Sequence, residues 1–334
     1  MTRRFFLWLG KAALAGLLAF ALLCFFCLLY YNVPVHDVNP TGATEYKWEP
    51  GRFYSRGTEG FAMGRTNSDG FNNLFDYAPG DPIDILLMGS SHMEGFNVAQ
   101  EDNAAAQLNK LFAGEKTVYN IGTAGHTLLY CVKHLDAALD TYAPGQYVLL
   151  ETMTLDFSPR DMDAVVSGTL ADIPSRSGGV VRLLQKLPFL RLVYNNYFRG
   201  AESFGDIAQP APAATPAPGE YDRALEALVD KLARESAAHS VRAVIVFNPA
   251  VGIASDGSLY TRTKPEQLAL FQQLCAEKGV AFLDLTEVYF DCYNEQHLLP
   301  SGFSNTAPAR GHLNRVGHRL MAEALYAAIR EWEG

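Results

Sequence analysis

Short apolar segments alternate with longer amphipathic segments through most of the chain after residue 80. The short segments are typical of buried strands and the longer ones of helices that cover them. We expect strands at 83–88, 117–121, 147–152, 241–247 and 280–285, and helices at 104–112, 127–142, 221–239, 265–279 and 314–332. This alternation predicts βαβ units, and therefore a three-layer, doubly wound α/β domain with a mainly parallel five-stranded sheet.

The N-terminal segment follows a different pattern. Residues 12–31 contain 20 consecutive uncharged residues, about the length that crosses a bilayer core of roughly 30 Å. Because Arg3, Arg4 and Lys11 precede it, we expect residues 1–11 in the cytoplasm and the rest of the chain outside. A cleaved signal peptide is the alternative, but its apolar core is shorter and ends in small residues. We therefore expect a single-pass membrane anchor.

The remaining chain divides into an extension and a domain. Residues 32–80 lack a sustained helical period and are interpreted as a stalk or irregular extension. Residues 81–334 form the α/β domain, with an insertion at about 157–220. Within the insertion, the apolar patch at 178–198 either packs on the domain or meets a membrane or partner. The Pro- and Ala-rich tract at 208–220 is expected to be an exposed linker.

Charge and cysteine content narrow the classes of partner. Three of the 27 basic residues precede residue 12, which leaves 24 basic against 36 acidic residues outside the membrane. An acidic ectodomain repels phosphate backbones, so nucleic acid is excluded as a partner. Two cysteines lie in the anchor, and the other three permit one disulfide at most: Cys131, Cys275 and Cys292. We expect no metal and no nucleotide cofactor, because neither metal-ligand spacing nor a phosphate-binding loop is present.

Candidate chemistry gathers where the predicted strands end. Ser91 follows the first strand, Gly125 follows the second, and His312 precedes the last helix. In an open α/β sheet, ligands bind beyond the carboxyl ends of the strands. A serine hydroxyl needs a nearby base to become nucleophilic, and neutral histidine suits that role near pH 7. Glycine leaves backbone N–H groups open to a developing oxyanion.

Three segments resemble the conserved blocks of the SGNH (GDSL-type) hydrolases, in their usual order. They are ILLMGSSHMEG (85–95), NIGTAGH (120–126) and GHLNRVGHRLMAEAL (311–325), and TNSDGF (66–71) resembles sequences upstream of the first block in extracytoplasmic members. The resemblance spans roughly 66–156 and 241–332 and implies a flavodoxin-like fold. It implies Ser91 as the nucleophile, His312 as the general base, and the backbone N–H groups of Ser91 and Gly125 as the oxyanion hole.

The chain departs from that family in the first and third blocks. Ser90 stands where aspartate is usual. The third block, with its Gly-x-Asn, is replaced by ETMTLD (151–156), so the asparagine donor is missing and Thr152 or Thr154 is the expected substitute. A GSSH first block with a glutamate after the third strand resembles a divergent, membrane-anchored branch of envelope proteins. That branch is similar to the D-alanyl transfer protein of teichoic acids and to alginate O-acetylation proteins.

The acid that orients the catalytic histidine is also absent from its usual place. Ala309 stands three residues before His312, where the family has an acid. Either a backbone carbonyl orients His312, leaving a Ser–His dyad, or an acid comes from elsewhere, with Asp156 as a candidate. His92 and His126 lie near the expected mouth and either bind substrate or pack.

Each catalytic candidate also has a structural explanation. Ser91 could be a helix N-cap, and His312 a loop histidine without a chemical role. Weighed together, these residues predict an extracytoplasmic serine esterase or O-acyltransferase. Its substrate would be an acyl ester, small or on an envelope glycopolymer, most often acetyl. A membrane-bound O-acyltransferase is the expected protein partner. The alternative is a non-catalytic protein with this fold that binds polymer or such a transferase.

Overall fold

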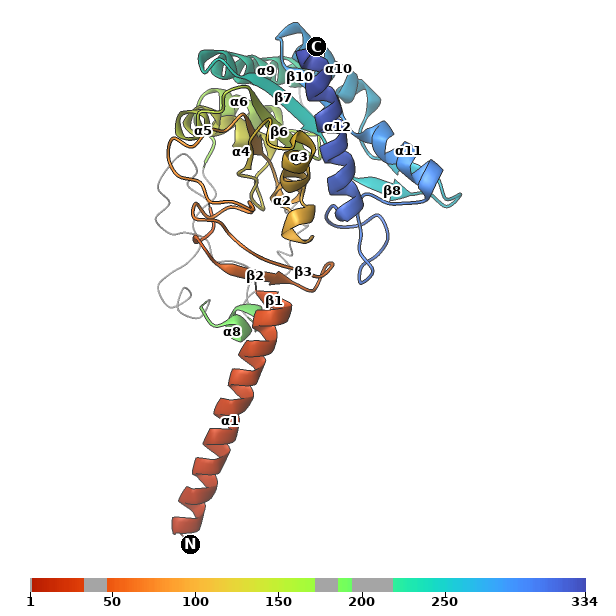
Figure 1. Cartoon of the computed structure of the whole chain (residues 1–334). Helices are drawn as coiled ribbons and strands as arrows, with labels where there is room; N and C mark the ends of the chain where they lie inside the picture. The colour runs from red at the N-terminus through yellow and green to blue at the C-terminus, as the bar shows by residue number, and fades with distance from the viewer. Residues whose placement is uncertain (1, 33–46, 172–185, 194–218) are drawn as a thin grey trace.

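A computed structural model describes residues 2–32, 47–171, 186–193 and 219–334. A long helix, α1 (Thr2–Tyr30), projects from an α/β domain, and the C-terminus lies at the far end of that domain (Figure 1). By length and apolar composition α1 is able to cross a membrane, and a signal sequence near the N-terminus would meet the same criteria.

The domain contains a five-stranded sheet in the order β10-β7-β6-β4-β5. Its strands are β4 (Ile85–Met88), β5 (Val118–Asn120), β6 (Tyr147–Thr152), β7 (Arg242–Phe247) and β10 (Ala281–Asp284). All four neighbouring pairs are parallel, which confirms the predicted fold class. Since β5 and β6 lie on opposite sides of β4, the strand order reverses there. That switch point is where ligands bind in open α/β sheets.

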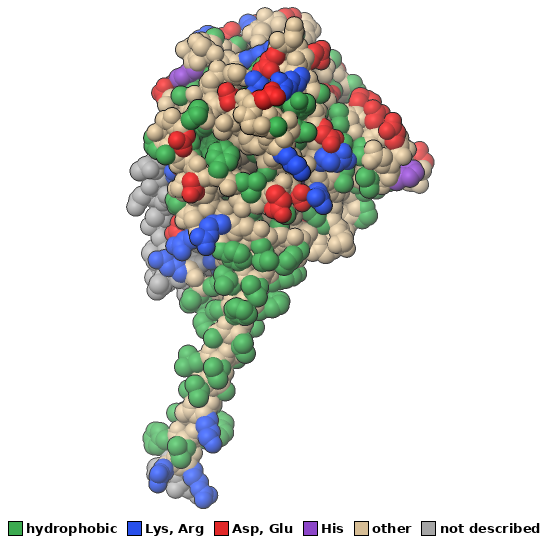
Figure 2. Space-filling model, viewed as in Figure 1, with side chains coloured by type: hydrophobic (Ala, Val, Ile, Leu, Met, Phe, Trp, Pro, Cys, Tyr) green, Lys and Arg blue, Asp and Glu red, His purple; other side chains and the backbone are tan. Residues whose placement is uncertain are grey.

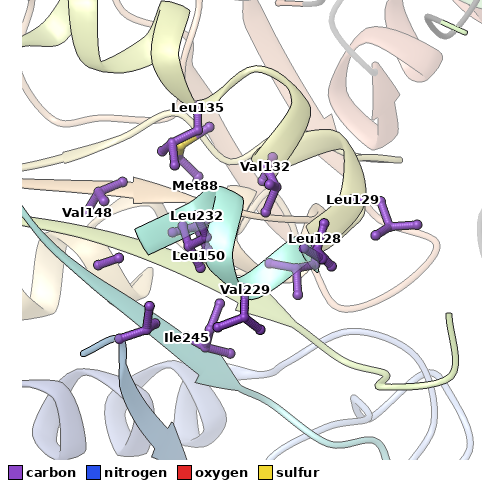
Figure 3. Close-up of a cluster of buried hydrophobic side chains, with 14 of the residues drawn as sticks. Met88, Leu128, Leu129, Val132, Leu135, Val148, Leu150, Val229, Leu232 and Ile245 are labelled. Carbon is purple, nitrogen blue, oxygen red and sulfur yellow. The ribbon is translucent and has the colours of Figure 1, made fainter. Parts of the chain in front are cut away.

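Helices cover both faces of the sheet. One face is covered by helices that include α4 (Leu128–Lys133), α5 (Leu135–Tyr142), α9 (Glu220–Ala238) and α10 (Pro265–Glu277), and the other by α3 (Ala104–Phe112), α11 (Thr286–Gln296) and α12 (Arg315–Glu333). Alternate strand residues divide between the two layers: Leu86 and Met88 join the first core, Ile85 and Leu87 the second. Figure 3 shows Met88 among side chains of α4, α5 and α9. Full burial of such a side chain stabilises the fold by about 1.5–3 kcal/mol.

Several elements differ from the sequence prediction. The helix expected at 127–142 is interrupted at His134, which separates α4 from α5. Additional elements are α6 (Pro159–Val166), α11, and a hairpin of β8 (Val251–Ile253) and β9 (Leu259–Thr261). The short strands and α6 are too brief to produce a clear periodic signal. The cysteines Cys131, Cys275 and Cys292 are buried free thiols.

Short strands within the N-terminal extension, together with the residues directly after α1, form a second sheet. It consists of β1 (Tyr31–Asn32), β2 (Phe53–Arg56) and β3 (Ala62–Arg65), all antiparallel. Strand β1 continues directly from α1, so the sheet joins the N-terminal helix to the domain (Figure 1). Strands of four residues separated by turn residues give no clear periodic signal in the sequence.

The expected insertion is described in part. Its residues 188–193 form α8 (Pro188–Val193), which packs against α1 and β1. The rings of Phe189 and Phe20 meet edge to face, with centroids 6.0 Å apart. Most of the Pro- and Ala-rich tract lies outside the described residues.

Candidate active site

The turn after β4 places Ser91 at the edge of the sheet. Ser90 caps the short helix α2 (Ser91–Glu94) through a hydrogen bond from His92 N to Ser90 Oγ, 3.2 Å long. Ser91 is therefore the first residue of the helix, half-buried, and its neighbour Ser90 takes the capping role. The hydroxyl of Ser91 remains available for another partner.

The buried carboxylate of Glu151 fixes the turn that carries Ser90 and Ser91. Glu151, at the end of β6, accepts hydrogen bonds from Ser90 N at 2.9 Å and from Ser90 Oγ at 2.8 Å. Its other oxygen accepts from Asn248 Nδ2 at 3.0 Å, and Asn248 accepts from Tyr289 at 2.8 Å. Burial raises the pKa of Glu151, and the hydrogen bonds from Ser90 and Asn248 oppose that rise. The glutamate of the divergent third block thus positions the residue beside Ser91.

Ser91, His312 and Glu59 form a continuous hydrogen-bonded chain. The distance from Ser91 Oγ to His312 Nε2 is 2.8 Å, and from His312 Nδ1 to Glu59 Oε2 it is 2.7 Å. Burial disfavours the charged form of Glu59, but hydrogen bonds from the ring and backbone N–H of His312 outweigh it, so the pKa of Glu59 is lowered. An ionised carboxylate holds the Nδ1–H tautomer, which leaves Nε2 free to accept a proton from Ser91.

Glu59 lies in the loop between β2 and β3, and residues from the C-terminal part of the chain fix it there. Asn305 accepts a hydrogen bond from Gly60 N at 2.8 Å and donates to Gly57 O at 2.9 Å. Gly311 has a φ of +82°, and a Cβ at this position would overlap Glu59 Oε1. Glycine is therefore required beside His312 for the carboxylate to approach.

Asp156 does not serve as the orienting acid. Its side chain is exposed, while Glu59 occupies the Nδ1 side of His312. The two threonines of the same segment are engaged locally: Thr152 Oγ1 donates to Thr154 O at 2.7 Å, and Thr154 Oγ1 accepts from Asp156 N at 3.0 Å. These contacts form a turn after β6.

The structure buries both histidines that were expected near the mouth. His92 is 6% exposed and stacks on His312, with ring centroids 5.0 Å apart. Its Nδ1 accepts a hydrogen bond from Leu313 N at 3.3 Å. Burial and the nearby charges of His312 and His318 hold the pKa of His92 well below its usual range, so His92 is neutral. His92 therefore packs against the His312 ring as an uncharged neighbour. His126 stacks on Tyr130, with ring centroids 4.0 Å apart.

The loop after β5 carries the expected oxyanion donor. Gly125 is exposed and has a φ of +90°, a conformation that favours glycine. The preceding residue is fixed by a buried acid: Ala124 N donates to Glu94 Oε1 at 3.0 Å, and Trp48 Nε1 donates to the same oxygen at 2.6 Å. Since Glu94 ends α2, one side chain joins the Ser91 helix to the loop of Gly125.

Glu94 makes the stability of this arrangement depend on pH. Burial raises the pKa of Glu94 to about 7, against the opposing hydrogen bond from Ala124 and charge of Arg56. Between about pH 4.5 and 7 the unfolded chain is ionised here and the folded chain is protonated, so Glu94 lowers the free energy of unfolding as pH rises. Glutamine keeps the acceptor oxygen and cannot ionise. We expect Glu94→Gln to gain stability relative to wild type by on the order of 2–3 kcal/mol between pH 4.5 and 8.

Denaturant unfolding of both proteins across this pH range measures that difference. Subtracting the two curves cancels the contributions of His92, His318 and Glu151, whose pKa values are also shifted. A difference that does not change with pH would show that Glu94 titrates normally in the folded protein.

No family model and no curated protein matches the chain. Among solved structures, similar chains include a psychrotrophic esterase EstA from Pseudoalteromonas sp., with a TM-score of 0.39, 16% identity and coverage of 74% of this chain and 97% of that one. An acetyl xylan esterase, AlAXEase, has a TM-score of 0.42, 12% identity and coverage of 74% and 100%. A lipolytic protein of the G-D-S-L family from Veillonella parvula DSM 2008 has a TM-score of 0.38, 14% identity and coverage of 74% and 98%. With TM-scores below 0.5 and identities of 12–16%, these similarities carry no conclusion about function.

Proposed function

We propose that the chain is a serine esterase or O-acyltransferase of the SGNH type, acting outside the cell on acyl esters of an envelope glycopolymer. The observation that carries the proposal is the hydrogen-bonded chain of Ser91, His312 and Glu59. A hydroxyl, an imidazole and a carboxylate in this order are the parts of a nucleophile, its base and the group that orients the base.

The proposed reaction has two acyl-transfer steps. Ser91 Oγ attacks the acyl carbonyl carbon as its proton passes to His312 Nε2, and the backbone N–H groups of Ser91 and Gly125 hold the oxyanion. When the tetrahedral intermediate collapses, His312 returns the proton to the departing sugar oxygen. Water or another hydroxyl then attacks the acyl-enzyme, with His312 again as base. Glu59 stabilises the imidazolium in both steps.

A non-catalytic role was favoured by two features of the sequence. One was the apparent lack of an orienting acid, because Ala309 occupies its usual position. Glu59 supplies a carboxylate at the Nδ1 atom of His312, so an orienting acid is present. The other was the missing asparagine donor of the third block. In that block, Glu151 instead accepts hydrogen bonds from the backbone N–H and the hydroxyl of Ser90. The hydrogen bond between Ser91 and His312 therefore favours the catalytic role.

We also propose that α1 is retained as a single-pass anchor with the N-terminus in the cytoplasm. Strand β1 follows α1 directly, and Asn32 Nδ2 donates to Phe53 O at 2.7 Å. Ser55 Oγ donates to Leu28 O in the last turn of α1 at 2.9 Å. Cleavage after α1 would remove the contact between Ser55 and Leu28 and leave the two-residue strand β1 as a free chain end, which supports an uncleaved helix. The proposed membrane-bound O-acyltransferase partner would then lie in the same membrane.

A serine-reactive phosphonate tests the proposed function on the full chain in detergent. We expect peptide mapping to place the adduct on Ser91, with no adduct in Ser91→Ala or His312→Ala and full labelling in the matched control Ser258→Ala. Adding an oligosaccharide acceptor to an acetyl-ester assay then separates transfer from hydrolysis by the products formed. A chain that is neither labelled nor active, yet binds glycopolymer, would support the accessory role instead.

A further inference from the structure

The β1–β3 sheet has one face on the catalytic domain and the other toward α1. On the inner face, the Tyr54 ring packs on Phe96 with centroids 4.2 Å apart, and its hydroxyl donates to Asn72 at 3.1 Å. Side chains of neighbouring strand residues point to opposite faces. Ser55 therefore points outward, where its hydroxyl meets Leu28 O of α1. The outer face is the side on which α1 ends.

That outer face carries large exposed apolar side chains. Met63 is paired directly with Ser55 across the two strands, so both side chains lie on the same face. Phe61 lies two residues before Met63, and the strand alternation, continued one residue beyond β3, places it on the same face. Phe61 is 63% exposed and Met63 is 44% exposed. Apolar residues grouped at an exposed face mark an interaction surface.

Helix α8 extends this apolar surface along α1. Phe189 contacts Phe20, which lies eleven residues before Tyr31, or about 16 Å along a helix. Leu187, just before α8, is 41% exposed. Figure 1 shows α8 beside the upper part of α1, beneath the small sheet, and Figure 2 shows hydrophobic side chains continuing from α1 onto the base of the domain.

We propose that the outer face of β2 and β3, together with α8, rests in the lipid surface, so that the active site works at the membrane. A bilayer is the occupant that the geometry favours. The face adjoins the end of α1, where the side chains of α1 are themselves exposed (Phe26 57%, Leu29 43%). If α1 spans the membrane, the contact between Phe189 and Phe20 lies at the depth of the hydrocarbon core. The proposal rests on the retention of α1 and adds to the proposed function that the ester substrate is membrane-associated.

The position of the triad acid links this surface to the chemistry. Glu59 precedes Phe61 by two residues, so seating Phe61 in the interface holds the loop of Glu59 within about 7 Å of chain length from the lipid. A substrate carried near the membrane, such as a glycopolymer on a lipid anchor, would reach Ser91 without leaving the surface.

Environment-sensitive labels on the full chain in liposomes test the proposal. An NBD dye is attached to cysteine at Phe61→Cys or Met63→Cys, in a Cys24→Ala background, because the other four cysteines are buried. The matched control is Leu111→Cys, 39% exposed near the end of α3. That end lies close to Glu115, which pairs with Arg330 near the C-terminus, far from α1 in Figure 1. We expect a blue shift and quenching by lipids brominated high on the acyl chain at 61 and 63, and neither at 111.

Each other outcome overturns the proposal for a distinct reason. Labels at 61 and 63 that remain in water, in a chain that resists carbonate extraction, would show an anchor without a lipid-seated sheet. A blue shift without quenching by brominated lipid would show that a protein, such as a second copy, covers the face. Extraction of the chain from the liposomes by carbonate would show that α1 does not anchor it in the bilayer. Phosphonate labelling of Ser91 in the same liposomes reports the proposed function independently.

Discussion

Glu59→Gln should lower kcat/KM for an activated acetyl ester by three to four orders of magnitude, with the fold intact. Glu59 accepts from the Nδ1–H of His312 at 2.7 Å, and its lowered pKa keeps it ionised at neutral pH. A glutamine can donate its amide N–H to Nδ1, which favours the tautomer that carries the proton on Nε2. That tautomer cannot accept the proton of Ser91, and losses of about 10⁴-fold follow from this change in serine hydrolases.

Asp156→Asn is the matched control, because it removes one carboxylate charge from an exposed side chain away from His312. We expect its kcat/KM to stay within a factor of two of wild type, and both variants to keep the wild-type thermal midpoint within a few degrees. Equal activity in Glu59→Gln and wild type would mean that His312 needs no carboxylate, as in a Ser–His dyad.

Ser91→Ala and His312→Ala should each lower kcat for the same ester by at least about 10⁴-fold, and the double variant should lose little more. In the proposed reaction the two side chains, 2.8 Å apart, exchange one proton, so either one alone has no partner for the transfer. Residues that act as a unit show this non-additivity. Residual activity above the uncatalysed rate would come from the oxyanion donors and from substrate binding.

His239→Ala provides the comparison for the histidine variant. His239 follows α9 and pairs with Asp136 at 2.9 Å, on a different element from the triad. We expect its kcat to remain unchanged. If the losses from Ser91→Ala and His312→Ala multiplied in the double variant, the two residues would be acting independently and the proposed proton transfer would be wrong.

The sequence was sufficient to predict the parallel sheet, because buried strands and amphipathic helices alternate regularly after residue 80. It also led to Ser91 and His312, which follow and precede regular elements at the same edge of the sheet. The same reasoning could not identify Glu59 as a partner of His312. Glu59 lies 253 residues from His312, in a turn between two four-residue strands, and only the tertiary fold joins the two side chains.

One signal near Glu59 was nevertheless present. Thr58-Glu59-Gly60 is an acid in a glycine-bounded turn, within a segment whose many aromatic residues are unusual for a flexible stalk. Trp48 and Tyr54 are almost fully buried, which shows that the segment packs as part of the domain. The roles of His92 and Glu151 were equally hidden, since whether a polar side chain is buried depends on neighbours from other parts of the chain.

The separation between Glu59 and His312 in the sequence also sets when the proposed site can be completed. Glu59 emerges early in synthesis, soon after α1, whereas His312 and the helix α12 emerge last. Contacts between distant parts of a chain form late, because a long loop must close before they are made. Under the proposed topology, a nascent chain that is still being exported therefore has Glu59 in place without His312. Under the proposed function, reactivity would begin only after the whole polypeptide has crossed the membrane.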